Sequence, residues 1–218
     1  NKQKLMLKKS YLNRLKEIIE MSFRTLEMKL ANGGIISKNE SSFQNELAHL
    51  LKVCGKLYEF NPNEKFNLEM DSYLVLNTSN IKSESKKARV DILVTLGTEE
   101  DYVKGVVELK FLKKKNHREP KNRYDMFKDI SYLESYKDIG IDLNYLFIST
   151  DHEHYVNQTN YSPDTKDFDM RDGKTYTSGN VLKYKTENLY GPPITLKGNY
   201  KFEWSEPVEN IYFCKIKV

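Results

Sequence analysis

Apolar residues recur along this chain with two periods, one helical and one strand-like, and the change between them marks the predicted elements. From 2 to 31 the spacing is helical, and Asn32, Gly33 and Gly34 then form a stop signal. A second helix is expected over 39–54, ending near Gly55. The apolar positions of the predicted 2–31 helix are Leu5, Leu12, Leu15, Ile18, Ile19, Phe23, Leu26 and Leu30. They predict a long amphipathic helix that packs on the core or on a second copy of the chain.

Strand-like runs and one further helix follow. The last part of the chain, from about 151, is rich in Asp, Asn, Thr, Tyr, Gly and Pro and has no helical period. We expect a polar, lysine-rich turn at 79–88, a helix over 124–137, and strands at 56–60, 65–70, 73–77, 88–94, 105–112, 145–149, 181–185, 194–196, 199–204 and 211–217. The pattern predicts one α/β core with a β-rich C-terminal extension.

Two of these strands carry acidic residues inside apolar runs. The sequences are ARVDILV at 88–94 and GVVELKFL at 105–112. Alternate side chains of a strand share a face, so Glu108 and Lys110 point the same way, and a hairpin would bring Asp91 to them. Buried charge is costly unless it is compensated, and two carboxylates with an ammonium suit a Mg²⁺ site. The structural alternative is a Glu108–Lys110 pair with Asp91 capping a turn.

The Glu-x-Lys spacing alone is not specific, because acid-x-Lys tripeptides recur in helical or polar stretches. Examples begin at Glu27, Glu84, Asp164 and Asp172. Only Glu108-Leu109-Lys110 lies in an apolar strand with a second strand-borne acid, Asp91, upstream. Here residues 37–150 resemble the PD-(D/E)XK nuclease superfamily, with Val90 at the position where its motif usually has proline.

The resemblance implies a restriction-endonuclease-like core, in which a central mixed β-sheet is flanked by helices. The whole chain, 1–218, would then be a single nuclease-like domain: an N-terminal helical segment at 1–36, the core at 37–150 and the extension at 151–218. Asp91, Glu108 and the Leu109 carbonyl would bind Mg²⁺ or Mn²⁺. Lys110 would orient or deprotonate the attacking water, or stabilise the transition state.

Nucleases of this kind often add a glutamate from the helix before the sheet, and two candidates stand in NESSFQNELAHLL at 39–51. On a helical wheel, Glu40 falls about 60° from Phe43, inside the apolar stripe, and Glu46 about 60° to the other side, at its edge. Glu40 is therefore the preferred catalytic acid and metal ligand, and Glu46 is the alternative. Ser37 with Glu40 also forms a capping-box pattern, which would explain Glu40 without catalysis.

A basic segment follows the motif strand and could hold phosphates, or it could be a solvated loop. Its residues are Lys113, Lys114, Lys115, Arg118, Lys121 and Arg123. Asp151-His152-Glu153-His154 is read as a polar loop, because no further ligand has zinc spacing. The aromatic residues of the tail, with Trp204, are expected to pack the extension more than to stack bases.

Composition adds few constraints. The 218 residues suffice for one sizeable core, and a net charge of +4 is only weak evidence for nucleic acid. With no long apolar run or signal peptide, we expect a cytoplasmic protein without a membrane partner. Cys54 and Cys214 are expected to be reduced and buried.

The favoured function is a metal-dependent nuclease that hydrolyses phosphodiester bonds of DNA, of restriction or defence type, with RNA left open as a substrate. The first alternative is a catalytically degenerate nuclease fold that binds nucleic acid or supports assembly. The second is an interaction protein built around the N-terminal helix, for instance a homodimer. Metal-stimulated cleavage separates the first reading from the others.

Overall fold

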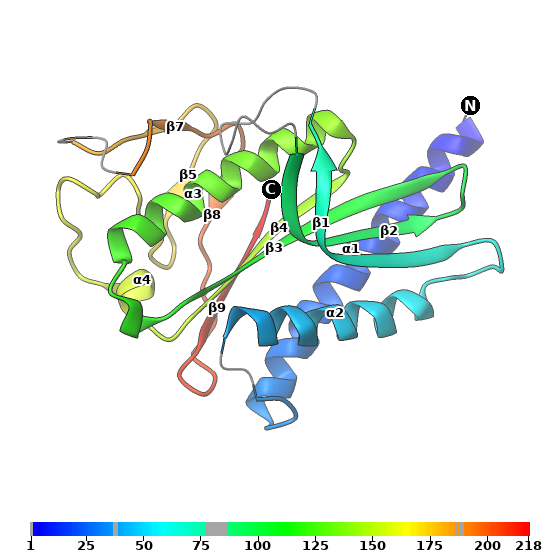
Figure 1. The fold of residues 1–218 in the computed structure, drawn as a ribbon, viewed down its shortest axis with the longest axis horizontal. Coiled ribbons are helices and arrows are strands. Elements are labelled where there is room, and N and C mark those ends of the chain that lie inside the picture. The colour runs from blue at the N-terminus through cyan, green and yellow to red at the C-terminus, as the bar shows by residue number, and fades with distance from the viewer. Residues whose placement is uncertain (1, 37–38, 77–86, 186, 188–189) are drawn as a thin grey trace. The chain divides into compact units, whose positions relative to one another are not determined.

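The computed structural model describes residues 2–36, 39–76, 87–185, 187 and 190–218. It is an α/β structure with a five-stranded mixed sheet, in the order β1-β2-β3-β4-β9, flanked by helices (Figure 1). The elements are α1 Lys2–Ala31, α2 Glu40–Leu57, β1 Lys65–Val75, β2 Lys87–Gly97, β3 Tyr102–Leu112, η1 Lys114–Asn116, α3 Glu119–Tyr136, η2 Lys137–Ile139, β4 Leu143–Thr150, α4 His154–Asn157, β5 Thr175–Tyr176, β6 Val181–Leu182, β7 Ile194–Thr195, β8 Tyr200–Lys201 and β9 Tyr212–Lys217.

The chain divides into two compact units. Residues 1–109 and 136–144 form the first, here called the N-terminal unit, and residues 110–135 and 145–218 form the second, the C-terminal unit. These units do not follow the three sequence segments, because the chain enters and leaves each unit more than once. The first contains α1, α2, β1, β2 and most of β3, and the second contains most of α3 and the β-rich extension.

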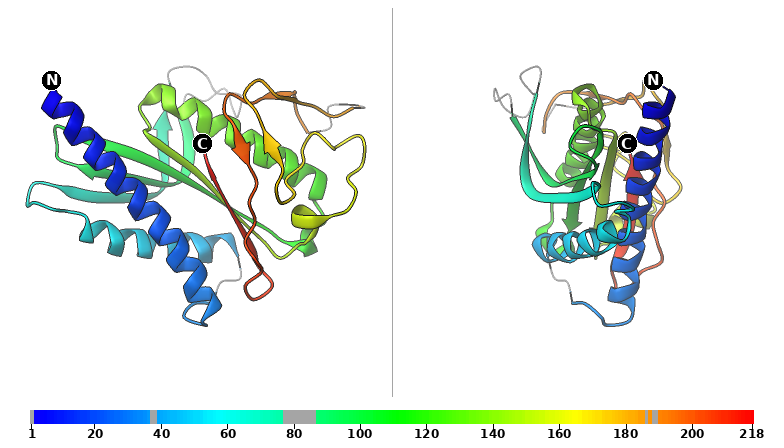
Figure 2. Two further views of the ribbon diagram at one scale, coloured as in Figure 1. Left: turned by 180° about the vertical axis from the view of Figure 1, so that it is seen from behind. Right: turned by 90° about the vertical axis from the view of Figure 1, so that its right-hand side faces the viewer.

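Helix α1, the long blue helix in Figure 2, confirms the predicted 2–31 helix. It buries its apolar stripe inside the N-terminal unit. Leu15, Ile18, Ile19 and Leu26 are completely buried. Leu5, which extends the stripe towards the N-terminus, is 72% exposed, so only the later turns of the helix pack on the core.

A buried ion pair fixes α1 to the segment before β1. The Arg14 guanidinium donates to both oxygens of Glu64, at 2.7 and 3.0 Å, and to the Tyr58 carbonyl at 2.7 Å. Glu64 also accepts from the Phe60 backbone N–H at 2.8 Å. Because both side chains are almost fully buried, each partner compensates a charge that would otherwise be costly.

Helix α2 differs from the prediction at both ends. It runs from Glu40 to Leu57, and its N-cap is Asn39, whose side chain and backbone exchange hydrogen bonds with Ser42. Gly55 does not stop the helix. It is buried within it, and a Cβ there would overlap the Phe66 ring of β1, so this glycine permits a close approach between helix and strand.

The strand predicted at 56–60 is wrong, because those residues are the end of α2 and the turn after it. The two strands predicted at 65–70 and 73–77 are one strand, β1, up to Val75. Asp71 has φ 53° and interrupts its pairing with β2, which runs from Lys65–Gly97 to Met70–Ile92 and resumes at Ser72–Val90. The polar turn predicted at 79–88 lies almost entirely outside the described residues.

In the C-terminal unit, α3 begins at Glu119, five residues earlier than predicted, and β4 confirms the core strand. The short strands β6 to β9 lie where they were expected. Glu134 of α3 ties the extension to this helix: its Oε1 accepts from the Lys197 and Gly198 N–H groups, both at 2.8 Å, and from the Tyr200 hydroxyl at 2.6 Å.

The aromatic residues of the extension mainly pack. Phe127 of α3 contacts Phe168, Tyr176 and Phe202 ring to ring. The Trp204 indole N–H donates to the Met170 carbonyl at 2.7 Å. These contacts match the expectation that the rings form a small core of their own rather than a base-stacking surface.

Both cysteines are free and buried, as predicted, and burial raises the pKa of Cys214 to about 12. Among the described residues, none of the helices combines the length and apolar character needed to cross a membrane.

The Arg14–Glu64 pair predicts a stability that depends on acid pH. Hydrogen bonds from Arg14 hold the pKa of Glu64 below its usual value, so the pair contributes fully above the unfolded pKa and is lost as pH falls through the folded one. Glu64→Gln should cost about 3–5 kcal/mol near pH 7, because Arg14 stays buried. Urea unfolding at several pH values should show this cost shrinking in acid.

Lys4→Gln is the control, since it breaks an exposed pair with Asp101 in the same unit. It should leave the unfolding midpoint almost unchanged. A loss for Glu64→Gln no larger than for Lys4→Gln would contradict the structural role of the buried pair.

Candidate functional site

Asp91 and Glu108 lie where the pairing of β2 with β3 ends. The facing residues run from Gly97–Tyr102 to Ile92–Val107, and Asp91 and Glu108 are the next two in register. At this point the Leu109 N–H donates to the Asp91 Oδ2 at 2.7 Å. A carboxylate thus takes the place of a backbone carbonyl, and Asp91 is held against the motif strand.

The backbone of Asp91 is held from the other side by α2. The Gln44 side-chain amide donates to the Asp91 carbonyl at 2.9 Å. Across from Asp91, the left-handed residue Asp71 interrupts the β1 ladder. The register is the same before and after Asp71, so β1 bends there without an inserted residue, and Figure 1 shows β1 and β2 changing direction together part of the way along.

Gln44 also indicates which helix glutamate lies nearer to Asp91. Glu40 is one turn before Gln44, about 40° away around the helix, whereas Glu46 is about 160° away. Both glutamates are partly exposed. The capping box that the structure describes is formed by Asn39 and Ser42. Ser37, the cap expected from sequence, lies outside the described residues.

The Leu109 carbonyl has the direction that a metal ligand would need. In an extended strand, the N–H and C=O of one residue point to the same side. Since the Leu109 N–H reaches Asp91, its carbonyl also faces the β2 side of the strand. Glu108 is only 6% exposed, which agrees with a carboxylate inside an apolar strand.

In the C-terminal unit, Lys110 pairs with Asp129 of α3. The Lys110 Nζ lies 3.6 Å from the Asp129 Oδ2, and Asp129 is 8% exposed. Sequence reasoning missed both Asp129 and Gln44. Asp129 follows the inward-facing Phe127 by two residues, but only the three-dimensional pairing distinguishes it from other helix acids.

The basic segment separates into an exposed turn and a helical part. Lys114, Lys115 and Arg118 are exposed and Lys113 is partly exposed around η1, whose Lys114 N–H is fixed by the Asp151 carboxylate at 2.7 Å. Arg123 is wrong as a phosphate ligand: it is 2% exposed, donates to Thr165 and lies 3.9 Å from the Tyr161 ring. It is buried because α3 begins before it and turns it inward.

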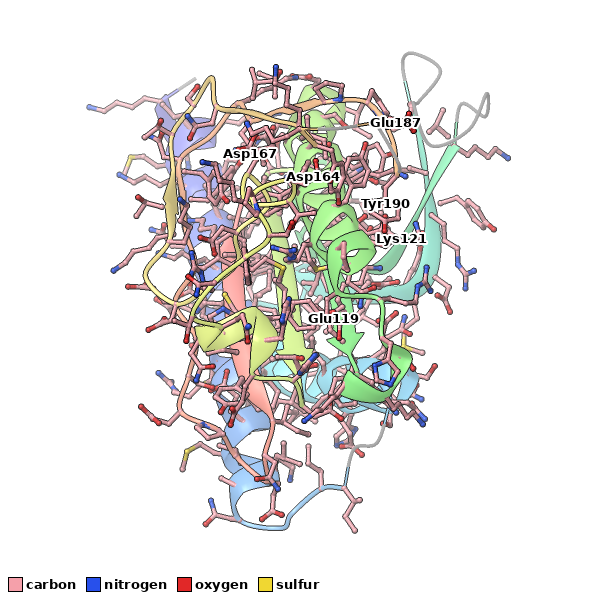
Figure 3. The ribbon with its side chains drawn as sticks, turned by 90° about the vertical axis from the view of Figure 1, so that its left-hand side faces the viewer. Glu119, Lys121, Asp164, Asp167, Glu187 and Tyr190 are labelled. Atoms are coloured by element: carbon pink, nitrogen blue, oxygen red, sulfur yellow. The ribbon has the colours of Figure 1, made fainter. Side chains whose placement is uncertain are left out.

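Lys121 also lies on α3, and its Nζ is 3.3 Å from Asp125. Figure 3 shows Lys121 with Tyr190 on a face that also carries the carboxylates of Glu119, Asp164, Asp167 and Glu187. Acidic neighbours oppose phosphate binding, so the η1 turn is the better candidate within this segment.

The Asp151–His154 segment has structural partners. His152 Nε2 lies 2.9 Å from Glu119 Oε1, and the His152 and His154 rings stack at 5.4 Å. Burial, with Arg123 nearby, lowers the pKa of His154. Within the part of the chain that is described, no group of three or more His, Cys, Asp or Glu side chains is arranged to hold a metal ion.

Comparison of the chain with protein-family models, curated proteins and solved structures finds no match.

The Asp91–Leu109 hydrogen bond can be tested apart from any activity. Asp91→Ala removes the acceptor and leaves the Leu109 N–H unpaired, which should cost about 1.5–3 kcal/mol. Asp91→Asn keeps an acceptor oxygen and should cost clearly less. Urea unfolding of both variants measures the difference, and equal losses would mean that this hydrogen bond does not stabilise the strand pair.

Proposed function

We propose that the protein is a nuclease that hydrolyses DNA with Mg²⁺ or Mn²⁺ on a restriction-endonuclease-like core. The observation that carries this proposal is the facing position of Asp91 and Glu108 at the end of the β2–β3 ladder, with Leu109 hydrogen-bonded to Asp91. Two strand-borne carboxylates and a carbonyl on that side offer the hard oxygen ligands that Mg²⁺ prefers. A restriction or defence role is part of the same proposal.

The donor set fits such an ion. Mg²⁺ commonly uses one or two carboxylates and completes its shell with waters and substrate phosphate, so a group of three acidic or histidine side chains is not required. When bound, the ion would polarise the scissile phosphate and lower the pKa of a coordinated water. Asp91, Glu108 and the Leu109 carbonyl would hold it, with Glu40 as the helix acid.

Lys110 would supply positive charge near the reacting phosphate. Its pairing with Asp129 supports a positioned ammonium that stabilises developing negative charge or orients the attacking water. The exposed lysines of the η1 turn would contribute salt-dependent binding to the phosphate backbone.

The alternative, a degenerate nuclease fold that binds nucleic acid or supports assembly, is favoured by one observation. Asp91 and Lys110 both have partners inside the protein, Leu109 and Asp129, so these contacts could serve stability alone. RNA remains a candidate substrate and a homodimer a candidate assembly in either case.

Cleavage should require a divalent metal and the three motif residues. Supercoiled plasmid, single-stranded DNA and RNA would be incubated with Mg²⁺, Mn²⁺ or EDTA. Asp91→Asn and Glu108→Gln should abolish turnover because they weaken cation binding while keeping side-chain shape. Lys110→Ala should abolish turnover but leave metal binding, measured by calorimetry, intact.

Lys121→Ala is the control, since it removes a lysine paired with an acid on the same helix that bears Asp129. It should cleave like the wild type. Wild-type cleavage rates from any motif variant would refute the site. A wild-type protein that binds nucleic acid but shows no metal-stimulated cleavage would favour the binding module.

The two helix glutamates should differ in their effect on metal dependence. Glu40→Gln should raise the Mg²⁺ concentration needed for half-maximal cleavage, or abolish cleavage, because Glu40 lies on the Gln44 side of α2. Its stability cost should stay near 0.3–1 kcal/mol, typical of a first-turn carboxylate. Glu46→Gln, the matched control on the same helix, should leave the metal titration unchanged. The reverse pattern would assign the role to Glu46.

A further inference from the structure

The open face of β1 and β2 in the N-terminal unit carries an aromatic residue and an arginine beside Asp91. Tyr73 faces Arg89 in the register of the two strands, so both side chains point to the same side of the sheet. Arg89 and Asp91 are alternate residues of β2 and share that side, about 7 Å apart along the strand. The intervening Val90 and the neighbouring Leu74 are buried on the opposite side.

Both residues are available to a ligand. Tyr73 is 62% exposed, and the Arg89 side chain is 60% exposed. The Asp71 carboxylate lies 2.9 Å from the Arg89 guanidinium and holds it beside the bend of β1. The hydrogen bond and charge of Asp71, with a smaller contribution from Asp91, raise the pKa of Arg89.

The other end of this face is mainly acidic. Beyond Asp91, the strands line a trough of about 990 Å³ that contains Lys65 and Lys104 but also Glu69, Glu99 and Glu100. Three carboxylates line that trough with two lysines, whereas at the Arg89 end an exposed tyrosine ring lies beside the arginine and offers a surface on which a base can stack. A nucleic acid strand that reaches Asp91 would therefore continue over Arg89 and Tyr73.

We propose that Tyr73 and Arg89 bind the nucleotide next to the scissile phosphate, and that this selects single-stranded DNA as the substrate. The inference rests on the proposed nuclease function. Arg89 would bind a backbone phosphate through its planar fork, and Tyr73 would stack on the adjoining base. A base is free to stack on a side chain in a single strand, whereas in a duplex its faces are covered by its neighbours.

Binding measured without turnover tests this directly. Fluorescence anisotropy of a labelled single-stranded oligonucleotide and of its duplex would be recorded in EDTA with the full chain. The wild type should prefer the single strand. Tyr73→Ala should weaken single-strand binding roughly 5- to 150-fold, the range for one lost stacked base, and leave duplex binding unchanged. Arg89→Gln should weaken it and reduce the salt slope by about 0.7, as for one single-strand phosphate contact.

Tyr102→Ala is the matched control, because Tyr102 faces Gly97 on the same side of the sheet, about 20 Å along β2 from Asp91. It is 45% exposed and should leave binding unchanged, and Asp71→Asn should retain binding because it leaves the arginine in place. Wild-type affinity from Tyr73→Ala, or a wild-type preference for duplex, would overturn the inference.

The two proposals fail separately. Tyr73-dependent binding without metal-dependent cleavage would refute the nuclease and keep the binding surface. Duplex cleavage that Tyr73→Ala does not affect would refute single-strand binding by Tyr73 and Arg89 and would leave the proposed nuclease activity in place.

Discussion

A hydrogen bond from the Leu109 N–H to the Asp91 carboxylate holds β2 to β3 at the point where their backbone ladder ends. This hydrogen bond fixes Asp91, and the contacts of α2 and β1 with this residue depend on its position. The Asp91 side chain accepts from β3, its carbonyl accepts from Gln44 of α2, and the left-handed residue Asp71 of β1 lies opposite. One acidic residue therefore fixes the relation of two strands and a helix, and the same residue offers a metal ligand.

Each compact unit is stabilised by a buried carboxylate with several donors. In the N-terminal unit, Glu64 joins α1 to the turn before β1 through Arg14. In the C-terminal unit, Glu134 joins α3 to the loop between β7 and β8 through two backbone N–H groups and Tyr200. Each of these carboxylates joins segments that are distant in the sequence, so the contacts specify the local arrangement as well as contributing energy.

The sequence predicted the features that depend on periodicity. The long first helix, the two motif strands and the short strands of the extension follow from spacing, and so does the shared face of Glu108 and Lys110. The features that depend on contacts between distant segments were missed. Gly55 has the sequence context of a helix stop, and only the Phe66 ring explains its place inside α2. Arg123 looked like part of a basic loop, and its burial requires Thr165 and Tyr161, about forty residues later. The pairing of Lys110 with Asp129 and the contact of Gln44 with Asp91 arise for the same reason.

The close contact at Gly55 couples the far end of α2 to the candidate site. The helix is a stiff rod, and Gly55 and Gln44 are eleven residues apart, which is about 16 Å along its axis. A methyl group at 55 would push α2 away from Phe66 and tilt the rod, so Gln44 would move relative to the Asp91 carbonyl. The distance between α2 and β1 at Gly55 thus determines where Gln44 lies relative to Asp91, although Gly55 itself contacts neither residue of the candidate site.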